Sequence, residues 1–314
     1  MYDIIGDIHG HLKALESLLD KLGYAFQNGS YRHSSRKAFF LGDFIDRGPD
    51  SRGVVRLVRS MVEAGNARAI MGNHEWNALQ YHTIHNSGGY LRQRNSKNRN
   101  QHLRTLESYE CEEDNISSDL ENDLFWFYSL PLFFENQEFC AVHATWDTNL
   151  IKELIKSHPD GVIDECFLRL ASEKGTREFA ISDSLLKGQE CELPEDWHFK
   201  DKDGNVRSNA RIKWWMDPER SEIVQNRNPE DYLFIPAPSS RTKTMPALDE
   251  FPSYPAHERP VFFGHYWKRY PPQLEAPNVC CLDYSVARGG HLMAYRWDGS
   301  RILSRENLVY VPSE

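Results

Sequence analysis

Apolar residues in the first 80 positions form two patterns that alternate along the chain. Residues 2–5, 38–41 and 67–71 are short apolar runs of strand length. Between these runs, residues 11–22 and 51–64 place apolar side chains three or four positions apart, which is typical of a helix that buries one face. Strands and helices that alternate with short connections predict a parallel sheet covered by helices on both faces.

The regular pattern ends after residue 82, where charge becomes the main feature. Residues 86–104 contain five basic residues and no acid, whereas residues 105–123 contain eight acids and no lysine or arginine. One interpretation is a solvated, partly helical insertion whose two halves neutralise each other. The other interpretation is that the basic half forms a lip that attracts an anionic substrate.

Strand-like runs resume later in the chain. We expect strands at 138–142, 261–263, 279–282, 292–297 and 301–305, and helical segments at 150–171 and 208–216. Asp298-Gly299 predicts a hairpin turn between the last two strands. Residues 226–255 are rich in proline and polar residues and are expected to form a long loop.

The composition is that of a globular protein, and its charge limits the classes of partner. The 314 residues include 37 lysines and arginines against 46 aspartates and glutamates, a net charge of −9. This balance argues against non-specific nucleic acid binding, which needs a positive field. A phosphorylated substrate stays compatible, because a bound metal ion supplies local positive charge. No apolar run approaches 18 residues and no basic leader begins the sequence, so we expect no membrane span and a cytoplasmic location.

Five of the predicted strands lead directly into residues that can bind a metal ion. The motifs are Gly-Asp-Ile-His-Gly at 6–10, Gly-Asp-Phe-Ile-Asp-Arg-Gly at 42–48, Gly-Asn-His-Glu at 72–75, Val-His-Ala at 142–144 and Phe-Gly-His at 263–265. Ligands of open α/β sheets bind beyond the carboxyl ends of the strands. We therefore expect these five strand ends to converge on one site. Because this chemistry draws on both ends of the chain, we predict a single domain, 1–314, with insertions at about 83–125 and 150–245.

The residue types in these motifs suit divalent metal ions. Asp7 and His9 are two positions apart, so on an extended backbone both side chains point the same way. Asp43 has two carboxylate oxygens and can bridge two cations. Oxygen and nitrogen donors without thiolate suit manganese, iron or zinc, and two ions about 3.5–4 Å apart can clamp a phosphoryl group and activate water. The six candidate ligands are Asp7, His9, Asp43, Asn73, His143 and His265.

Together, these motifs resemble those of the calcineurin-like metallophosphoesterases, in particular the phosphoprotein phosphatase branch that includes bacterial diadenosine tetraphosphatases. The resemblance is close over the first 80 residues and is confined to landmarks beyond them. It implies an α/β fold, a four-layer α/β/β/α metallophosphoesterase sandwich with helical and polar insertions. It also implies two divalent metal ions, with manganese as our first choice and iron, zinc, nickel or cobalt as alternatives. One ion would be held by Asp7, His9 and Asp43, and the other by Asp43, Asn73, His143 and His265.

The resemblance also implies roles for residues that do not bind metal. His74 would be the general acid that protonates the leaving oxygen, and Asp46 would orient it. Arg47 would bind the phosphate oxygens through its planar guanidinium. A second phosphate-binding arginine is expected, and Arg211 is the candidate because the Trp-Trp-Met-Asp-Pro segment at 214–218 is similar to the Leu-Trp-Ser-Asp-Pro segment of protein phosphatases. The alternative for Arg211 is an ordinary charge on a helix surface.

The chain departs from the family pattern at two places. Trp267 stands where many phosphodiesterases of the superfamily carry a second metal-binding histidine, which favours the phosphoprotein phosphatase branch. The loop after the fourth strand is His143-Ala144-Thr145 instead of His-Gly-Gly or His-Ala-Gly.

A few other residues invite a role without belonging to a motif. His82, His85 and His102 lie in or near the polar insertion and have no partner motif, so we assign them no role. Asp283 ends a late strand and is a candidate for supporting a ligand. The pair Trp214-Trp215 either stacks on a nucleobase or packs in the interior.

We therefore predict a dimetal-dependent phosphoester hydrolase, a Ser/Thr-type phosphomonoesterase that uses a metal-bridging hydroxide and acts on a phosphorylated protein or a nucleotide. The alternative is a symmetrical bis(5'-nucleosyl)-tetraphosphatase, because the ligand motifs are the same for both. A non-enzymatic interaction scaffold with the phosphoesterase fold is a third interpretation, but a scaffold should have lost ligands and this chain keeps all six. A nuclease is disfavoured by the acidic balance and by Trp267.

Overall fold

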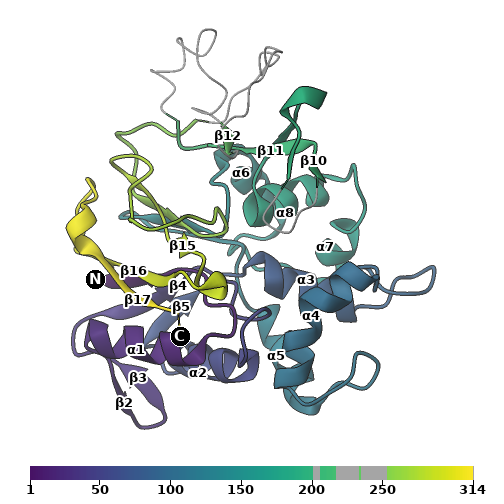
Figure 1. The fold of residues 1–314 in the computed structure, drawn as a ribbon, viewed down its shortest axis with the longest axis horizontal. Coiled ribbons are helices and arrows are strands. Elements are labelled where there is room, and N and C mark those ends of the chain that lie inside the picture. Colours follow the sequence, from purple (N-terminus) through teal and green to yellow (C-terminus); the bar gives the residue numbers. More distant parts are fainter. Residues whose placement is uncertain (201–205, 217–232, 235–252, 314) are drawn as a thin grey trace. The chain divides into compact units, whose positions relative to one another are not determined.

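The computed structural model describes residues 1–200, 206–216, 233–234 and 253–313, and the chain forms two compact units (Figure 1). The larger unit comprises Met1–Lys187 and Arg259–Glu314, and the smaller unit comprises Gly188–Glu258. In sequence, the smaller unit therefore interrupts the larger one and overlaps the second predicted insertion. The organisation as one domain with insertions stays a prediction.

The larger unit contains a six-stranded sheet whose centre is built from the predicted N-terminal strands. Its order is β15-β16-β1-β4-β5, and β17 pairs with β16. Strand β4 is parallel to β1 and β5, whereas β16 is antiparallel to β1. The strands are β1 (Tyr2–Ile5), β4 (Lys37–Phe40), β5 (Ala67–Ala69), β15 (Asp283–Tyr284), β16 (His291–Trp297) and β17 (Leu308–Pro312). A separate hairpin is formed by β2 (Ala25–Gln27) and β3 (Ser30–Arg32).

A second sheet of the larger unit has four strands in the order β14-β13-β7-β6. They are β6 (Phe133–Glu135), β7 (Cys140–Val142), β13 (Val261–Phe263) and β14 (Val279–Cys281). Strand β13 is parallel to both of its neighbours, and β6 is antiparallel to β7. The predicted strands of this region are therefore confirmed to within a few residues.

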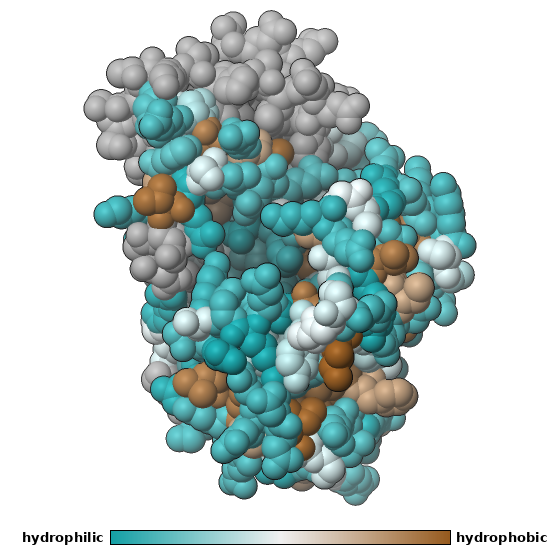
Figure 2. Space-filling view, turned by 90° about the vertical axis from the view of Figure 1, so that its right-hand side faces the viewer, coloured by the Kyte–Doolittle hydropathy of each residue, from teal (hydrophilic) through white to brown (hydrophobic). Residues whose placement is uncertain are grey.

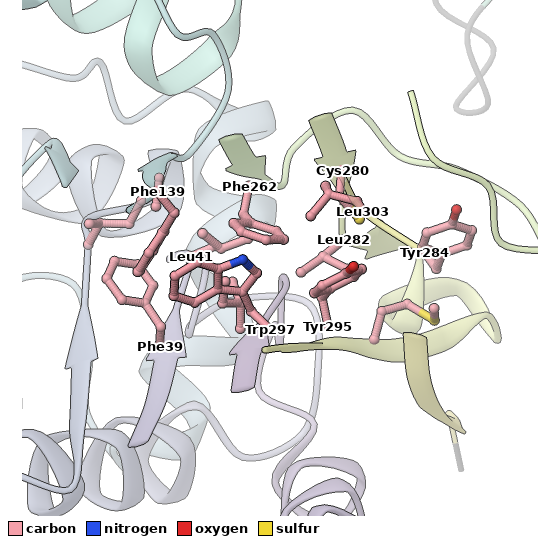
Figure 3. Packing of buried hydrophobic residues seen from close by; sticks show 14 residues of the cluster. Phe39, Leu41, Phe139, Phe262, Cys280, Leu282, Tyr284, Tyr295, Trp297 and Leu303 are labelled. Carbon is pink, nitrogen blue, oxygen red and sulfur yellow. The ribbon is translucent and has the colours of Figure 1, made fainter. Parts of the chain in front are cut away.

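The hydrophobic core joins the two sheets, because its buried side chains come from both (Figure 3). The ring centroid of Phe139 lies 5.6 Å from that of Phe39, 5.9 Å from that of Phe262 and 4.9 Å from that of Trp297. Aromatic pairs at such separations contribute about 0.5–1.5 kcal/mol each beyond their apolar burial. Two sheets packed on a shared apolar layer confirm the predicted sandwich.

Helices complete the fold. Helix α1 (Leu12–Leu22) packs on β16 and β17, and α2 (Ser51–Glu63) packs on β5. Helix α1 ends at Gly23, which adopts the left-handed conformation that favours glycine. The other helices are α3 (Asn73–His82), α4 (Ser96–Ser108), α5 (Ser118–Phe127), α6 (Thr148–Ser157), α7 (Glu165–Leu170) and α8 (Arg177–Lys187), with short 3₁₀ turns at Val286–Arg288 and Arg305–Asn307. Among the residues described, no helix is long and apolar enough to cross a membrane.

The first predicted insertion is partly helical, and its charges largely neutralise each other. Arg94 pairs with Asp114 at 2.6 Å, and Arg99 pairs with Glu113 at 2.9 Å. Arg104 pairs with Glu107 at 2.8 Å. Three of the four arginines of the basic half are therefore engaged by acids of the other half, which favours the solvated insertion over a basic lip. The described surface in Figure 2 is mainly hydrophilic, with apolar residues in small separate groups.

The smaller unit contains short strands where a helix was predicted. Strand β11 (Asn209–Ile212) pairs with β8 (Glu190–Glu192) and β12 (Leu233–Phe234), so the helix predicted at 208–216 is wrong. The reason is a two-residue alternation, in which Ala210 and Ile212 are buried with Leu233 and Trp197. The unit also contains a 3₁₀ turn (Glu195–Trp197) and the hairpin strands β9 (Phe199–Lys200) and β10 (Val206–Arg207). Most of the loop predicted at 226–255 lies outside the described residues.

The strand predicted at 301–305 is also wrong, because the strand that pairs with β16 begins at Leu308. Asp298 Oδ1 accepts a hydrogen bond from the backbone N–H of Ser300, as expected for a turn. The chain then leaves the sheet, because the N–H of Leu303 donates to Pro277 O and the Leu303 side chain is buried in the core. The connection between β16 and β17 is therefore longer than a tight hairpin.

Candidate metal centre and the residues beside it

The structure brings the five predicted strand ends together within the larger unit. His143 Nε2, after β7, lies 3.3 Å from Asp43 Oδ1, after β4, and 3.1 Å from Asn73 Oδ1, after β5. His9 Nε2, after β1, lies 3.5 Å from Asp43 Oδ2. His265, after β13, belongs to the same group as Asp43 and His143. The expected convergence is therefore observed.

Asp43 lies at the centre of two groups of potential ligands. Within each group, the donor atoms lie within 4.8 Å of one another among the residues described. One group consists of Asp43, His143 and His265, which are three of the four residues predicted for the second ion. The other consists of His9, Asp43 and His74, so the predicted general acid lies beside this carboxylate, and Asp7 belongs to neither group among the residues described.

Asp7 lies against the last strand end, at Gly264 and His265. Its Oδ2 accepts a hydrogen bond of 3.1 Å from the backbone N–H of His265. A Cβ atom on Gly264 would lie 2.0 Å from Asp7 Oδ1, so a side chain at this position would displace the carboxylate. The ligand role of Asp7 stays a prediction.

The backbone at the site is strained at five predicted residues. The φ angle is +50° at His9, +53° at Asp43, +68° at Asp46, +67° at Arg47 and +60° at His265. Residues other than glycine rarely adopt positive φ, and such strain concentrates at functional sites. The expectation that Asp7 and His9 lie on an extended backbone is wrong, because β1 ends at residue 5 and the chain turns sharply at His9.

Backbone carbonyls fix the orientation of two of the histidines. His9 Nδ1 lies 3.2 Å from Ile45 O, and His143 Nδ1 lies 2.8 Å from Leu41 O. A carbonyl oxygen can only accept, so each Nδ1 carries the hydrogen and each Nε2 is directed at Asp43. A ligating histidine commonly makes this second hydrogen bond, which sets its tautomer.

Glu75 braces the loops that carry the candidate ligands, a role that the sequence did not indicate. Its Oε2 accepts from the backbone N–H of Asp43 at 2.8 Å and of Gly72 at 3.0 Å, while its Oε1 accepts from Phe44 at 2.8 Å. The residue belongs to the motif at 72–75, but a structural brace has no signature in a single sequence. Burial raises the pKa of Glu75 to about 7, and Asp43 acts in the same direction.

The electrostatics of the cluster favour added positive charge. Burial raises the pKa of Asp7 well above its ordinary value, and the nearby carboxylates of Asp283 and Asp43 add to this effect. Burial alone would lower the pKa of His143, but Asp43 and Asp7 outweigh it and raise the pKa to about 10. Burial opposes the charge on Asp43, yet His143 and His74 hold its pKa well below the usual range. Buried carboxylates of this kind require a cationic partner.

The residues present therefore fit divalent metal ions. Two carboxylates, three imidazoles and one amide oxygen converge, and five of these six residues are no more than 7% exposed. This set of oxygen and nitrogen donors is the one that suits ions such as manganese, iron and zinc.

His74, Asp46 and Arg47 lie together beside this cluster. His74 Nδ1 is 2.6 Å from Asp46 Oδ2, and Arg47 Nη2 is 3.3 Å from His74 Nε2. A carboxylate only accepts and a guanidinium only donates. The neutral imidazole therefore carries its hydrogen on Nδ1 and exposes the Nε2 lone pair to Arg47, whose side chain is exposed.

The sequence missed two residues that hydrogen-bond the side-chain carboxylate of Asp46. His102 Nδ1 lies 3.0 Å from Asp46 Oδ1, and Thr105 Oγ1 donates to the same oxygen at 2.6 Å. Both lie on α4, within the insertion, where no motif marks them. His102, to which the sequence analysis assigned no role, is therefore a partner of Asp46.

The remaining candidates have more ordinary surroundings or lie in the smaller unit. Arg211 lies on strand β11, and its Nε is 3.9 Å from Glu190 Oε1. The alternative that Arg211 is a charge on a helix surface is therefore wrong, because the residue is not in a helix. Its phosphate-binding role stays a prediction. Trp214 is 1% exposed and its ring lies 6.0 Å from that of Tyr254, which favours packing. Asp283 is buried and its negative charge raises the pKa of Asp7, while its role in supporting a ligand stays a prediction.

The family model for calcineurin-like phosphoesterases matches residues 2–234. The chain belongs to the calcineurin-like phosphoesterase family. The match covers the candidate ligands from Asp7 to His143 but not His265. The family resemblance stated from the sequence motifs is therefore confirmed.

Curated relatives of two kinds are similar to this chain. The asymmetrical bis(5'-nucleosyl)-tetraphosphatase PrpE of Oceanobacillus iheyensis is 55% identical over 73 residues, which are 23% of this chain and 29% of that protein. The symmetrical bis(5'-nucleosyl)-tetraphosphatase of Pectobacterium carotovorum is 24% identical over 311 residues, covering 97% of this chain and 94% of that protein. The chain thus matches less than a third of the length of the first relatives.

Two of the solved structures that align with this chain have TM-scores below 0.5. The structure of a putative diadenosine tetraphosphatase has a TM-score of 0.43 and 16% identity, covering all of this chain and 93% of that one. A protein serine/threonine phosphatase from Saccharomyces cerevisiae has a TM-score of 0.49 and 16% identity, covering all of this chain and 79% of that one.

Proposed function

We propose that this protein is a metal-dependent phosphoester hydrolase with a site for two divalent ions. The observation that carries the proposal is the position of Asp43, whose two oxygens face separate groups of histidines. Asp7, His9 and Asp43 would hold one ion, and Asp43, Asn73, His143 and His265 would hold the other, with manganese as our first choice. When bound, such ions polarise phosphoryl oxygens and lower the pKa of water.

The chain's own residues supply the remaining functions of the proposed reaction. Once protonated at Nε2, which displaces the contact with Arg47, His74 would donate that proton to the leaving oxygen, while its Nδ1–H stays engaged by Asp46. Arg47 would bind phosphate oxygens, since its guanidinium is exposed and reaches His74 Nε2. Arg211 remains the candidate for a second phosphate-binding arginine.

The substrate we propose first is a phosphomonoester on serine or threonine. It is supported by the complete motif at 42–48, in which Asp46 is kept and engages the imidazole of His74. Protonation by this imidazole matters most for a poor alkyl leaving group. A phosphorylated protein in the cytoplasm is the corresponding partner and location.

A dinucleoside tetraphosphate is the second candidate, and two observations favour it. The relative aligned over nearly the whole chain is named a symmetrical tetraphosphatase. In addition, Arg92 hydrogen-bonds three amide oxygens, those of Asn77, Asn98 and Gln101. Within the described part of the chain, the guanidinium of Arg92 pairs with no carboxylate. Its partner Gln101 is near the site, because Gln101 Nε2 lies 3.4 Å from His74 Nδ1. Arg92 thus offers positive charge for additional phosphates next to the site.

The experiment compares substrates on protein stripped of metal and reloaded with manganese, iron, zinc, nickel or cobalt. Phosphate release from a phosphoserine peptide is measured against hydrolysis of diadenosine tetraphosphate, with the nucleotide products separated. We expect hydrolysis only with metal and a higher kcat/KM for the peptide. A preference of tenfold or more for the dinucleotide, with ADP as product, would reverse our order of substrates. A folded, metal-loaded protein that hydrolyses neither would support the scaffold interpretation.

A further inference from the structure

The carboxylate of Asp46 is held from two sides. Its Oδ2 accepts from His74 Nδ1 at 2.6 Å, while its Oδ1 accepts from His102 Nδ1 at 3.0 Å and from Thr105 Oγ1 at 2.6 Å. His102 and Thr105 lie one turn apart on α4 and are 4% and 0% exposed. Both oxygens of Asp46 are thus engaged, and α4 supplies every partner of Oδ1 that the described residues provide.

Helix α4 also holds the backbone of Asp46. The N–H of Asp46 donates to Ser51 Oγ at 3.1 Å and to Thr105 Oγ1 at 3.0 Å. This residue has a φ angle of +68°, a strained conformation that persists only where the surroundings enforce it. The main chain and the side chain of Asp46 are therefore both set by contacts with α2 and α4.

The direction of each hydrogen bond in this group follows from Asp46. An ionised carboxylate only accepts, so His102 must carry its hydrogen on Nδ1. His102 Nε2 is then an acceptor in its neutral form, and His82 Nε2 lies 3.0 Å away on α3. His82 therefore donates to His102, His102 donates to Asp46, and His74 donates to Asp46 from the opposite side.

We propose that His102 is a positioning residue for the hydrolysis, which acts through Asp46 to hold the His74 ring with its Nδ1–H bonded to Asp46 and its Nε2 directed at the leaving group. The inference rests on the proposed function, in which His74 is the general acid. A carboxylate that is bonded only to His74 could rotate about its last side-chain bond. The bonds to Oδ1 prevent this rotation and so fix the plane in which His74 Nδ1–H must lie.

The test uses two variants that differ in one hydrogen bond. In His102→Leu the donor to Asp46 is lost while the apolar volume is roughly kept. In His102→Asn the side-chain amide can still donate from nearly the position of Nδ1, but it does not reach His82. His85→Leu is the matched control, because His85 lies in the same segment and contacts Ser87.

Each variant is assayed on an alkyl phosphate, phosphoserine peptide, and on an activated aryl phosphate, p-nitrophenyl phosphate. Because proton donation contributes about 10²–10⁴-fold, we expect His102→Leu to lower kcat on the alkyl ester about tenfold or more while changing the aryl ester much less. His102→Asn should recover most of the loss, and His85→Leu should match the parent protein. Equal losses on both esters, no loss in a folded variant, or an Asn variant as poor as the Leu variant would overturn the inference.

A spectroscopic measurement keeps the inference separate from the proposed function. Long-range ¹H–¹⁵N spectra of the histidine side chains report which ring nitrogen carries the hydrogen. We expect His102 in the Nδ1–H form. If the parent protein hydrolyses neither ester, the proposed function fails, but the tautomer of His102 can still be measured. An Nε2–H tautomer of His102 would overturn its hydrogen bond to Asp46, on which the inference depends.

Discussion

Gly264 and Asp7 lie so close together that a methyl group on Gly264 would be 2.0 Å from Asp7 Oδ1. The Gly264→Ala variant must therefore push the Asp7 carboxylate away from its place against the His265 backbone. Changes in residues that support metal ligands typically cost about 10–100-fold in metal affinity. We expect a loss of about tenfold or more, measured by metal content after dialysis against a competing chelator.

The control for this prediction is Gly65→Ala. No atom lies within 4 Å of a Cβ at this position, although its φ angle of +72° also disfavours a side chain. The control should lose some stability and keep its metal. If both variants retain metal equally well, Asp7 does not contribute to the site in the proposed way.

Asp43 is expected to be indispensable, because its two oxygens face both groups of potential ligands. Asp43→Asn removes one negative charge from between the histidines and should lower kcat more than about 100-fold. The fold should survive, since the site lies at strand ends and not in the core, and circular dichroism would check this. Chelation of the parent protein should abolish activity, and a divalent ion should restore it. Full activity after verified removal of metal would exclude the dimetal proposal.

The sequence was sufficient to predict the sandwich and the convergence of the five strand ends, for a clear physical reason. Buried parallel strands give unbroken apolar runs, and their carboxyl ends must meet at one edge of the sheet. The site residues are also local to these ends, so their positions follow from the strands. The helix predicted at 208–216 failed because a four-residue strand carries too few positions to separate a period of two from a helical period.

The role of α4 could not be predicted from one sequence. His102 is 56 residues away from Asp46 and lies in a charged segment without a motif. The contact depends on how the insertion folds back, which is a property of tertiary packing. Glu75 was visible as part of a motif, but its hydrogen bonds go to backbone N–H groups, which exist at every position and leave no trace in residue types.

His74 is expected to matter most when the leaving group is poor. His74→Asn removes the proton donor, so hydrolysis of a phosphoserine peptide should fall by about 10²–10⁴-fold. Hydrolysis of p-nitrophenyl phosphate should fall far less, because its leaving group needs no proton. The ratio of kcat values on the two esters is the measurement. Equal losses would mean that His74 holds a metal ion or substrate, as its position beside His9 and Asp43 also allows.

The last prediction concerns stability against pH and uses His82. Burial lowers the pKa of His82 from 6.5 to about 3, and the neighbouring His102 and Arg94 act in the same direction, while Glu113 and Asp46 oppose it. At pH values between these two pKa values, His82 is protonated in the unfolded chain but not in the folded protein. The free energy of unfolding should therefore fall as pH falls, by up to about 1.4 kcal/mol per pH unit from this residue.

The His82→Gln variant keeps a hydrogen-bond donor toward His102 but cannot take up a proton in this range. The stability difference between the parent protein and the variant should therefore shrink as the pH is lowered. From pH 6.5 to pH 5, we expect the difference in the free energy of unfolding to change by up to about 2 kcal/mol in favour of the variant. Urea unfolding of both proteins at several pH values measures it, since all other titrating groups are shared and cancel in the difference. A stability difference that stays constant over this pH range would show that His82 has the same pKa in the folded and unfolded protein. The burial of this imidazole beside His102 would then have no effect on its pKa.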